Sequence, residues 1–342
     1  MLKRYMRGKW DLCFLLILIG FVLTVPVITP QGVSAQSKEI IMKVGYPMGA
    51  TPAHPHYLVG NHLKKRVEEL TNGRVKVQLY PQSQLGGDRE TIEGAMNGTI
   101  EMSWPASAPI ALAVPEIASL DLPYIFKDEK HAFRALEGRV GKQLEAKLLA
   151  KGIRVGGWGH ANFRNTLTVK KPINKLEDLQ GVKIRVMEAP IFLEMYKAWG
   201  AKPTPVAWPE VYMALSQGVV EGEDVGVNAA LDMKHFEIVR YIGLTYTSFT
   251  LRPIIISEKW WQTLSSDIQS AILKASRETA ILMRQKLNEF EEQCIAAAKE
   301  KHKVIVTQPD LKPFREAVQA IYPKLEKVVG GREIIDAILS VQ

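Results

Sequence analysis

Hydrophobic and polar residues alternate along the N-terminal half of the chain in a pattern that changes between period 2 and helical spacing. Alternating runs predict strands and 3.6-residue periodicity predicts helices. In chain order the predicted elements are a strand at 40–46, a helix at 55–71, a strand at 74–80, a helix at 89–97 and a strand at 100–104. This strand–helix order favours a parallel sheet covered by helices. A further helix ends at Gly152, and a strand follows at 153–158.

A second region with the same mixture of elements extends from about Asn162 to Thr247. It contains a predicted strand at 182–187 and helices at 190–199 and 209–217. The longest helical pattern follows at 265–301, where 37 residues contain no proline or glycine. At 1.5 Å per residue such a helix would reach about 55 Å, which exceeds the diameter of a small domain. We therefore expect it to brace two domains, and a break near its middle is the alternative.

The first 35 residues have the pattern of a secretory signal peptide. A basic start is followed by an apolar stretch at 12–25, and Val33-Ser-Ala35 offers a cleavage site before Gln36. A retained membrane anchor is the alternative, but 14 apolar residues are fewer than the roughly 20 that a spanning helix needs. We expect cleavage and a soluble protein exported to the periplasm.

Composition narrows the class of protein. The net charge of +8 falls to +5 when the four basic residues and one acidic residue of the first eleven positions are removed. Basic residues are scattered, with no basic tail or stripe, so no nucleic-acid partner is expected. Cys294 would be the one cysteine left, which excludes an intramolecular disulfide and suggests an inert core residue. Neither G-x-S-x-G, H-E-x-x-H nor G-x-G-x-x-G after a strand occurs, so we do not expect an enzyme or a cofactor.

Arg185 is the most informative single residue. It lies near the end of the predicted strand at 182–187, where a side chain is half buried or buried. A guanidinium stays protonated and its planar fork matches a carboxylate in two parallel hydrogen bonds. The local sequence leaves two interpretations open, a structural salt bridge to an acidic side chain or a site for an anionic ligand.

Ordered motifs over nearly the whole chain after residue 35 resemble one family, the substrate-binding subunits of tripartite ATP-independent periplasmic (TRAP) transporters of the dicarboxylate-binding-protein type. The motifs are Gly73-Arg-Val-Lys-Val77, Tyr80-Pro-Gln-Ser-Gln-Leu-Gly-Gly-Asp88, Gly98-Thr-Ile-Glu-Met102, Asp121-Leu-Pro-Tyr-Ile-Phe126, Leu176-Glu-Asp-Leu-Gln-Gly-Val-Lys-Ile-Arg-Val186, Gly200-Ala-Lys-Pro-Thr-Pro205, Glu210-Val-Tyr-Met-Ala-Leu215 and Gly218-Val-Val-Glu-Gly222. Each is weak alone, and their order and spacing carry the resemblance.

The resemblance implies an α/β, two-domain periplasmic-binding-protein (type II-like) fold with a cleft that closes on ligand and a long helix bracing both domains. It implies domain I at 36–161 plus 251–289 and domain II at 162–250 plus 290–342. The implied function is to bind an organic acid and deliver it to the membrane permease subunits of a TRAP transporter. A receptor for an ATP-driven importer or a sensor kinase remains the nearer alternative, and an exported enzyme the more distant one.

The resemblance also implies a set of ligand-binding residues. The arginine matching Arg185 grips the ligand carboxylate in the family, Arg164 matches a frequent second arginine, and Trp208 matches an aromatic residue beside the ligand. The expected set is completed by Tyr46, Trp104, Trp158, Glu188, Val225 and Arg252. The tryptophans either wall the cleft with apolar surface or belong to the core.

Departures from the family leave the ligand open. Val225 replaces an asparagine that often binds polar groups, and Glu188 stands where asparagine is frequent, which disfavours a heavily hydroxylated, sialic-acid-like ligand. A hydrophobic or aromatic acid, a 2-oxo acid and a dicarboxylate remain possible ligands. Glu221, Glu223 and Asp224 either hold a cation that bridges to the ligand or form a solvated acidic loop. His54 and His56 suggest a helix start or surface position more than a metal site.

Overall fold

The computed structural model describes residues 39–49, 51–52 and 54–341, and these form one compact unit. The predicted signal peptide at 1–35 lies outside the described residues. No helix of the described ranges has the length and hydropathy needed to cross a bilayer.

A five-stranded sheet forms the first half of the fold, in the order β2-β1-β3-β10-β4. Its strands are β1 (Ile40–Gly45), β2 (Val75–Tyr80), β3 (Met102–Ser103), β4 (Ile153–Phe163) and β10 (Phe249–Ser257). As predicted, β1 is parallel to β2 and β3. The sheet is nevertheless mixed, because β10 returns from far along the chain and lies antiparallel between β3 and β4.

A six-stranded sheet forms the second half, in the order β11-β9-β5-β8-β6-β7. Its strands are β5 (Asn165–Thr168), β6 (Lys183–Val186), β7 (Lys202–Pro205), β8 (Gly222–Val225), β9 (Tyr241–Gly243) and β11 (Ile305–Thr307). The strand β6 that carries Arg185 is parallel to both of its neighbours, β7 and β8. Their carboxyl ends therefore meet at one edge of the sheet.

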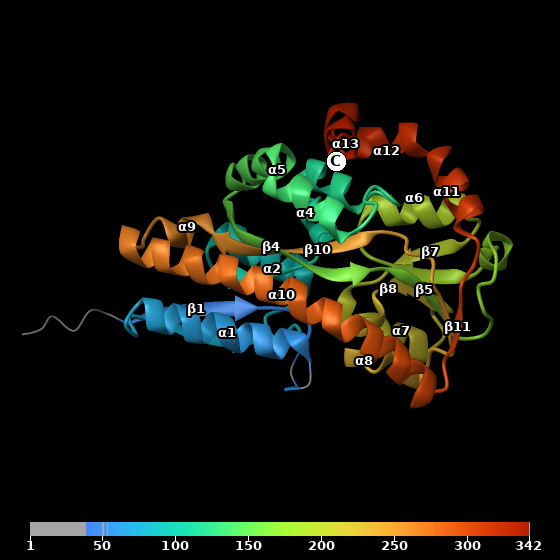
Figure 1. Cartoon of the computed structure of the whole chain (residues 1–342), viewed down its shortest axis with the longest axis horizontal. Helices are drawn as coiled ribbons and strands as arrows, with labels where there is room; N and C mark the ends of the chain where they lie inside the picture. The colour runs from blue at the N-terminus through green and yellow to red at the C-terminus, as the bar shows by residue number, and fades with distance from the viewer. Residues whose placement is uncertain (1–38, 50, 53, 342) are drawn as a thin grey trace, which may run out of the picture. The chain divides into compact units, whose positions relative to one another are not determined.

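Helices cover both sheets (Figure 1). Around the first sheet lie α1 (Pro55–Leu70), α2 (Asp88–Asn97), α3 (Ser107–Ile110), η1 (Pro115–Asp121), α4 (Glu129–Glu137), α5 (Arg139–Leu149) and α9 (Glu258–Trp261). Around the second lie η2 (Leu176–Leu179), α6 (Pro190–Ala198), η3 (Trp208–Glu210), α7 (Val211–Ser216), α8 (Val227–Asp232), η4 (His235–Glu237) and α11 (Leu311–Gln319). The chain ends with α12 (Tyr322–Val328) and α13 (Arg332–Leu339). Four buried apolar clusters fill the space between helices and sheets.

The start of α1 shows how local sequence sets an element. The His54 side chain accepts a hydrogen bond from the backbone N–H of His56 at 3.1 Å, and Pro55 occupies the first helical position. A cap of this kind satisfies an N–H that the helix cannot. The helix-start role predicted for His54 is confirmed, although both histidines are buried and not on the surface.

The long helix is α10 (Ser266–Glu300), 35 residues without interruption. Its first half packs Ile268, Ile272 and Met283 into the cluster of the first sheet, and its last turns pack Cys294 and Ala298 into a cluster of the second. Figure 1 shows it extending from beside α1 to beside α8. Glycine in β4 permits its close approach, because a Cβ on Gly157 would lie 2.8 Å from the Cβ of Ala280. The predicted brace is therefore present.

The chain passes between the sheets at the β4–β5 junction, at the β9–β10 junction and along α10. The predicted domain boundaries, 36–161 with 251–289 and 162–250 with 290–342, stay predictions. Leu325 of α12, Val329 directly after it, and Ile335 and Ile338 of α13 are buried in the cluster that also contains residues of α4 and α5.

The β4–β5 junction is tied to α10 by Glu291. Asn162, which has a φ of 64°, donates its side-chain N–H to a Glu291 carboxylate oxygen at 2.9 Å and to the Leu287 carbonyl at 3.0 Å. Burial raises the pKa of Glu291 from 4.5 to about 7, with Asn162 and the Asn228 N–H opposing the rise. The carboxylate thus carries a charge at a junction between the sheets only above neutral pH.

We expect Glu291→Gln to stabilise the protein at pH 8 and to leave it unchanged at pH 4. Because the folded-state pKa lies above the unfolded value, the folded protein holds the proton more tightly. The stability that protonated Glu291 contributes is fully present below about pH 4.5 and is lost as the pH rises through about 7. Urea unfolding of the variant should show a gain on the order of 2 kcal/mol at pH 8. The control is Glu289→Gln, at an exposed position of the same helix. An equal gain in stability at pH 4 and pH 8 would contradict the raised pKa of Glu291.

Candidate ligand-binding site

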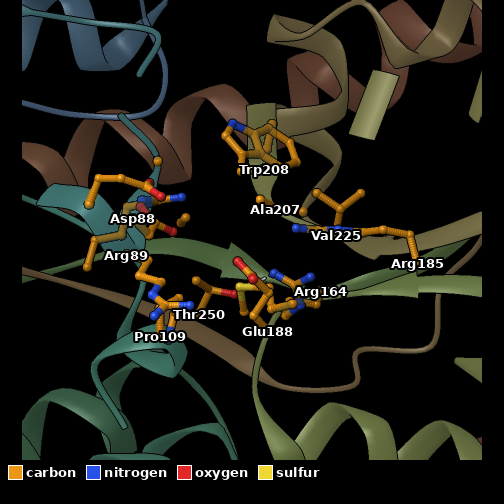
Figure 2. A pocket seen from close by; sticks show the side chains of 17 residues that line it. Asp88, Arg89, Pro109, Arg164, Arg185, Glu188, Ala207, Trp208, Val225 and Thr250 are labelled. Atoms are coloured by element: carbon orange, nitrogen blue, oxygen red, sulfur yellow. Dashed lines mark hydrogen bonds between the residues drawn. The ribbon is translucent and has the colours of Figure 1, made fainter. Parts of the chain in front are cut away.

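A cavity lies between the two sheets and is lined by residues from both. The space between the lining residues amounts to about 600 Å³ when the open solvent at its mouth is included. The lining residues are Gly87, Asp88, Arg89, Glu90, Pro109, Ala161, Arg164, Arg185, Met187, Glu188, Ala207, Trp208, Val225, Gly226, Ala229, Thr250 and Arg252. Figure 2 shows Asp88 and Arg89 on one side and Arg185, Trp208 and Val225 on the other. The carboxyl ends of β6 and β8 reach this cavity, where open α/β sheets bind ligands.

Arg185 reaches the cavity from β6 with a side chain that is only 2% exposed. Its Nε donates to the Val206 carbonyl at 3.0 Å, and its guanidinium lies 5.6 Å from the centre of the Trp208 ring. Burial lowers its pKa to about 10, so it remains charged at neutral pH. Within the described residues it forms no ion pair with an acidic side chain. The structural salt bridge left open by the sequence is therefore absent there, and a counterion from outside would complete the site.

Arg164 follows β4 and is paired inside the protein. Its Nε donates to the Asp224 carboxylate, another guanidinium N–H donates to the Asp224 carbonyl, and Nη1 lies 3.4 Å from the Thr250 hydroxyl. The same carboxylate accepts hydrogen bonds from the hydroxyls of Tyr196 at 2.8 Å and Thr247 at 2.9 Å. Arg164 thus lines the cavity with its charge already neutralised.

Arg252 contributes a third guanidinium from β10. It is 6% exposed, and Nη1 donates to the Trp104 backbone carbonyl at 3.3 Å. Its buried Nε has no hydrogen-bond partner among the described residues. Burial lowers its pKa, while nearby Asp88 opposes that change. Two of the three buried arginines therefore face the cavity without a bonded counterion in the described part of the chain.

The other predicted lining residues Trp208, Val225 and Glu188 also border the cavity. Trp208 presents its ring to Arg185 and has a buried Nε1 without a partner in the described residues. Val225, at the end of β8, is buried, whereas Glu188 is exposed. The structure thus brings together six of the nine predicted residues.

The remaining three, Tyr46, Trp104 and Trp158, lie in the core and do not border the cavity. The ring centres of Tyr46 and Trp104 lie 4.3 Å apart. The contact of Trp104 with Arg252 is made by its backbone carbonyl, which accepts a hydrogen bond from the guanidinium. The indole of Trp158 donates to Glu145 on α5 at 2.8 Å. Since neighbouring positions of a strand point to opposite faces, the strand that sends Ala161 to the cavity sends Trp158 to the helices.

Asp88 was missed as a candidate, although it ends the Gly-Gly-Asp motif that the sequence singled out. It is the first residue of α2, and its buried Oδ1 has no hydrogen-bond partner in the described residues. Burial raises the pKa of this carboxyl, and the Arg252 guanidinium and the Ala106 N–H oppose the rise. The sequence signal was present as a helix start after two glycines, but nothing local indicated which way the side chain points.

The acidic residues near β8 are neither a cation site nor a solvated loop. Glu221 pairs with Lys170 at 2.9 Å, while Glu223 and Asp224 are fully buried within the strand. A carboxylate oxygen of Glu223 lies 2.8 Å from Nδ1 of His235, and the carboxylate of Asp224 forms an ion pair with Arg164. No group of three metal-ligating side chains occurs in the part of the chain that the structure describes.

Comparison with known proteins identifies the family. Residues 47–328 match the model for bacterial extracellular solute-binding proteins, family 7. The Escherichia coli 2,3-diketo-L-gulonate-binding periplasmic protein is 27% identical, with 94% of this chain and 97% of that protein covered. The Vibrio cholerae sialic acid-binding periplasmic protein is 30% identical over 90% of this chain and 95% of its own.

Solved structures agree in fold. The Advenella mimigardefordensis sugar acid binding protein in complex with galactonate has a TM-score of 0.85 at 28% identity, covering 89% of this chain and 99% of that one. A TRAP periplasmic solute binding protein from Sulfurospirillum deleyianum with bound succinate has a TM-score of 0.83 at 31% identity, with the same coverage. The predicted two-domain periplasmic-binding-protein fold is confirmed, and the chain belongs to family 7 of the extracellular solute-binding proteins, which are the solute-binding proteins of TRAP transporters and not enzymes.

Proposed function

We propose that the protein is a periplasmic receptor that binds an organic acid through its carboxylate and delivers it to the membrane permease subunits of a TRAP transporter. The observation that carries this proposal is the buried guanidinium of Arg185, which has no acidic partner in the described residues. Burying an ion without a counterion costs several kcal/mol. An imported carboxylate would supply the missing charge and accept the two-pronged hydrogen bond.

The surroundings of Arg185 support an anion over a neutral solute. Arg252 adds a second guanidinium with an unpaired Nε, and Arg164 contributes donors while its charge is balanced by Asp224. Trp208 and Val225 supply apolar surface against which the carbon chain of a ligand can pack. Relatives crystallised with galactonate and with succinate bind acids in the same fold.

Uptake by this route would proceed by capture and closure. Ligand bound between the two sheets contacts both, so it stabilises the closed arrangement and excludes water, which strengthens the attraction between arginine and carboxylate. Export to the periplasm rests on the predicted signal peptide at 1–35, and the permease partner rests on the family.

A thermal-shift screen of organic acids on the protein lacking residues 1–35 tests the proposal. A ligand that binds only the folded form at 100 times its Kd adds about 2.7 kcal/mol, which raises Tm on the order of 5 °C. We expect one or more carboxylates to give such a shift, and neutral sugars and amines to give none. Shifts produced by sugars or amines, with no carboxylate active, would refute it.

A further inference from the structure

The strand β4 has a free edge on the side away from the cavity between the sheets. It is the last strand of the first sheet, and in the described residues it pairs only with β10. Helices α5 and α10 cover opposite faces of the sheet at this edge (Figure 1). Ile255 of β10 packs in the cluster of α5, whereas Ile254 and Ile256 pack in the cluster of α10. The edge of β4 therefore lies between two helices.

A groove follows this edge. It consists of two adjoining hollows, whose spaces amount to about 860 Å³ and 540 Å³ when the open solvent at their mouths is included. The floor is formed by residues 154–158 of β4. One face of α5 and one face of α10 form the walls, with Lys142, Glu145, Ala146 and Leu149 on α5 and Arg277, Ala280, Ile281 and Arg284 on α10.

Other edges of the two sheets are closed to strand pairing. At the opposite end of the first sheet, the N–H of Val77 in β2 donates to Glu68 at 3.1 Å, and its carbonyl accepts from Lys64 Nζ at 3.0 Å. In the second sheet, the edge strand β7 contains Pro203 and Pro205, which have no N–H to donate. Proteins block exposed edges in these ways to prevent the addition of unwanted strands.

The edge of β4 is closed at one point only among residues 154–158. There the Nε of Arg284 donates to the Trp158 carbonyl at 2.8 Å. In the described residues no side chain bonds the backbone of residues 154–157. At about 3.3 Å per residue this open stretch spans roughly 13 Å. Because the two helices form walls beside it, the groove admits a single extended chain more readily than the edge of another folded sheet.

The walls combine exposed apolar side chains with free cations. Leu149 of α5 is 40% exposed and Ile281 of α10 is 53% exposed. Lys142 and Arg277, on the same two helices, are also exposed. Neither cation forms an ion pair with an acidic side chain in the part of the chain that the structure describes. Each wall thus offers one apolar contact and one positive charge.

The acidic side chains of the groove are already bonded within the protein. Glu145 accepts a hydrogen bond from the Trp158 indole at 2.8 Å, and Glu137 accepts one from Nη1 of Arg284 at 2.6 Å. The charge left for a partner is therefore positive. A chain that complements this groove carries carboxylates next to apolar side chains.

We propose that the groove binds an extended acidic peptide segment of a partner protein, which adds to β4 as a strand. In this mode of recognition the main-chain hydrogen bonds supply affinity, and contacts of alternate side chains supply specificity. The carboxylates of the segment pair with Lys142 and Arg277, and its apolar side chains cover Leu149 and Ile281. The groove shares no lining residue with the cavity between the sheets, so the protein can hold a solute and a peptide together.

Fluorescence anisotropy with labelled octapeptides tests the inference at pH 7.5 on the chain without residues 1–35. The acidic peptides carry glutamate at alternate positions, with valine, isoleucine or threonine between. We expect at least one of them to bind at least tenfold more tightly than the matched peptide with lysine in place of glutamate. Proline in place of the intervening residues should abolish binding, because it removes the N–H groups that a strand needs. Failure of every acidic peptide to bind, or equal binding of the lysine or proline peptides, would overturn the inference.

Protein variants locate the bound peptide. Replacing Lys142 and Arg277 together by glutamate places like charges opposite the acidic peptide and should weaken its binding at least tenfold. Lys312→Glu, at an exposed position of α11, is the control for charge and should leave binding unchanged. Melting curves check that the variants are folded.

Hydrogen exchange of the unmodified protein gives a second readout. Bound peptide should slow exchange of backbone amides within residues 154–157 at least tenfold, because strand pairing engages N–H groups that are otherwise open to solvent. Peptide affinity undiminished in the double variant, or protection found only outside β4, α5 and α10, would overturn the inference. Neither result bears on the binding of organic acids in the cavity.

Discussion

Replacing Arg185 by alanine is expected to weaken binding of the cognate carboxylate by about a hundredfold to ten-thousandfold. Removal of one partner from a buried ion pair typically costs about 3–5 kcal/mol, and each 1.4 kcal/mol is a factor of ten in affinity. Arg185 is 2% exposed, and the guanidinium N–H groups not bonded to Val206 remain for the ligand. Titration calorimetry with the acid that gives the largest thermal shift measures the loss.

The same substitution should not destabilise the ligand-free protein. In the described residues the Arg185 charge is buried without an acidic partner, so its removal relieves a desolvation cost while it gives up one hydrogen bond and the contact with Trp208. Binding sites often trade stability for function in this way. Arg139→Ala, which removes an exposed arginine on α5, is the matched control for charge. A loss of affinity below tenfold, or a loss explained by unfolding, would contradict the role assigned to Arg185.

The fold was predictable where the local pattern is long and uninterrupted. The helix α10 was predicted from a run without proline or glycine. The strands β1, β2 and β3 were predicted from short runs that the two predicted helices at 55–71 and 89–97 separate. The position of β10 was not predictable, because every residue of this strand is buried and its sequence carries no alternation that assigns it to a sheet. Its pairing with β3 and β4 is determined by tertiary packing, and a single sequence gives no information on such packing.

The candidate site was predictable to the extent that its residues sit in recognisable motifs. Arg185, Arg164 and Trp208 were placed through family motifs, and the structure brings them to one cavity, although their contact with a ligand stays a prediction. The direction in which these side chains point could not be predicted from the sequence. Breaks in the register between β10 and β4 alter which residues share a face, so the alternation that governs Trp158 is not readable from sequence. The sequence around Asp224 is typical of a polar loop. The residue is instead buried in a strand, where its charge is stabilised by buried partners such as the Tyr196 hydroxyl.

Asp224→Ala should destabilise the protein by about 3–5 kcal/mol, the largest stability effect expected in the site. The substitution leaves the Arg164 guanidinium buried without its counterion and removes the acceptor for the hydroxyls of Tyr196 and Thr247. Unpaired buried donors each add to the cost of the unpaired charge. Urea unfolding at pH 7.5, followed by far-UV circular dichroism, measures the free energy of unfolding.

Two comparisons show whether the unpaired charge causes that loss. Tyr196→Phe deletes a single hydrogen bond to Asp224 and should cost only about 1 kcal/mol. Replacing Arg164 and Asp224 together by methionine and leucine removes both charges, so the double variant should be more stable than Asp224→Ala alone. Bound acid should also raise the stability of Asp224→Ala by more than that of the unmodified protein, because the ligand carboxylate then compensates two guanidinium groups in place of one. A double variant no more stable than the single one would show that packing, and not the buried charge, holds this part of the site together.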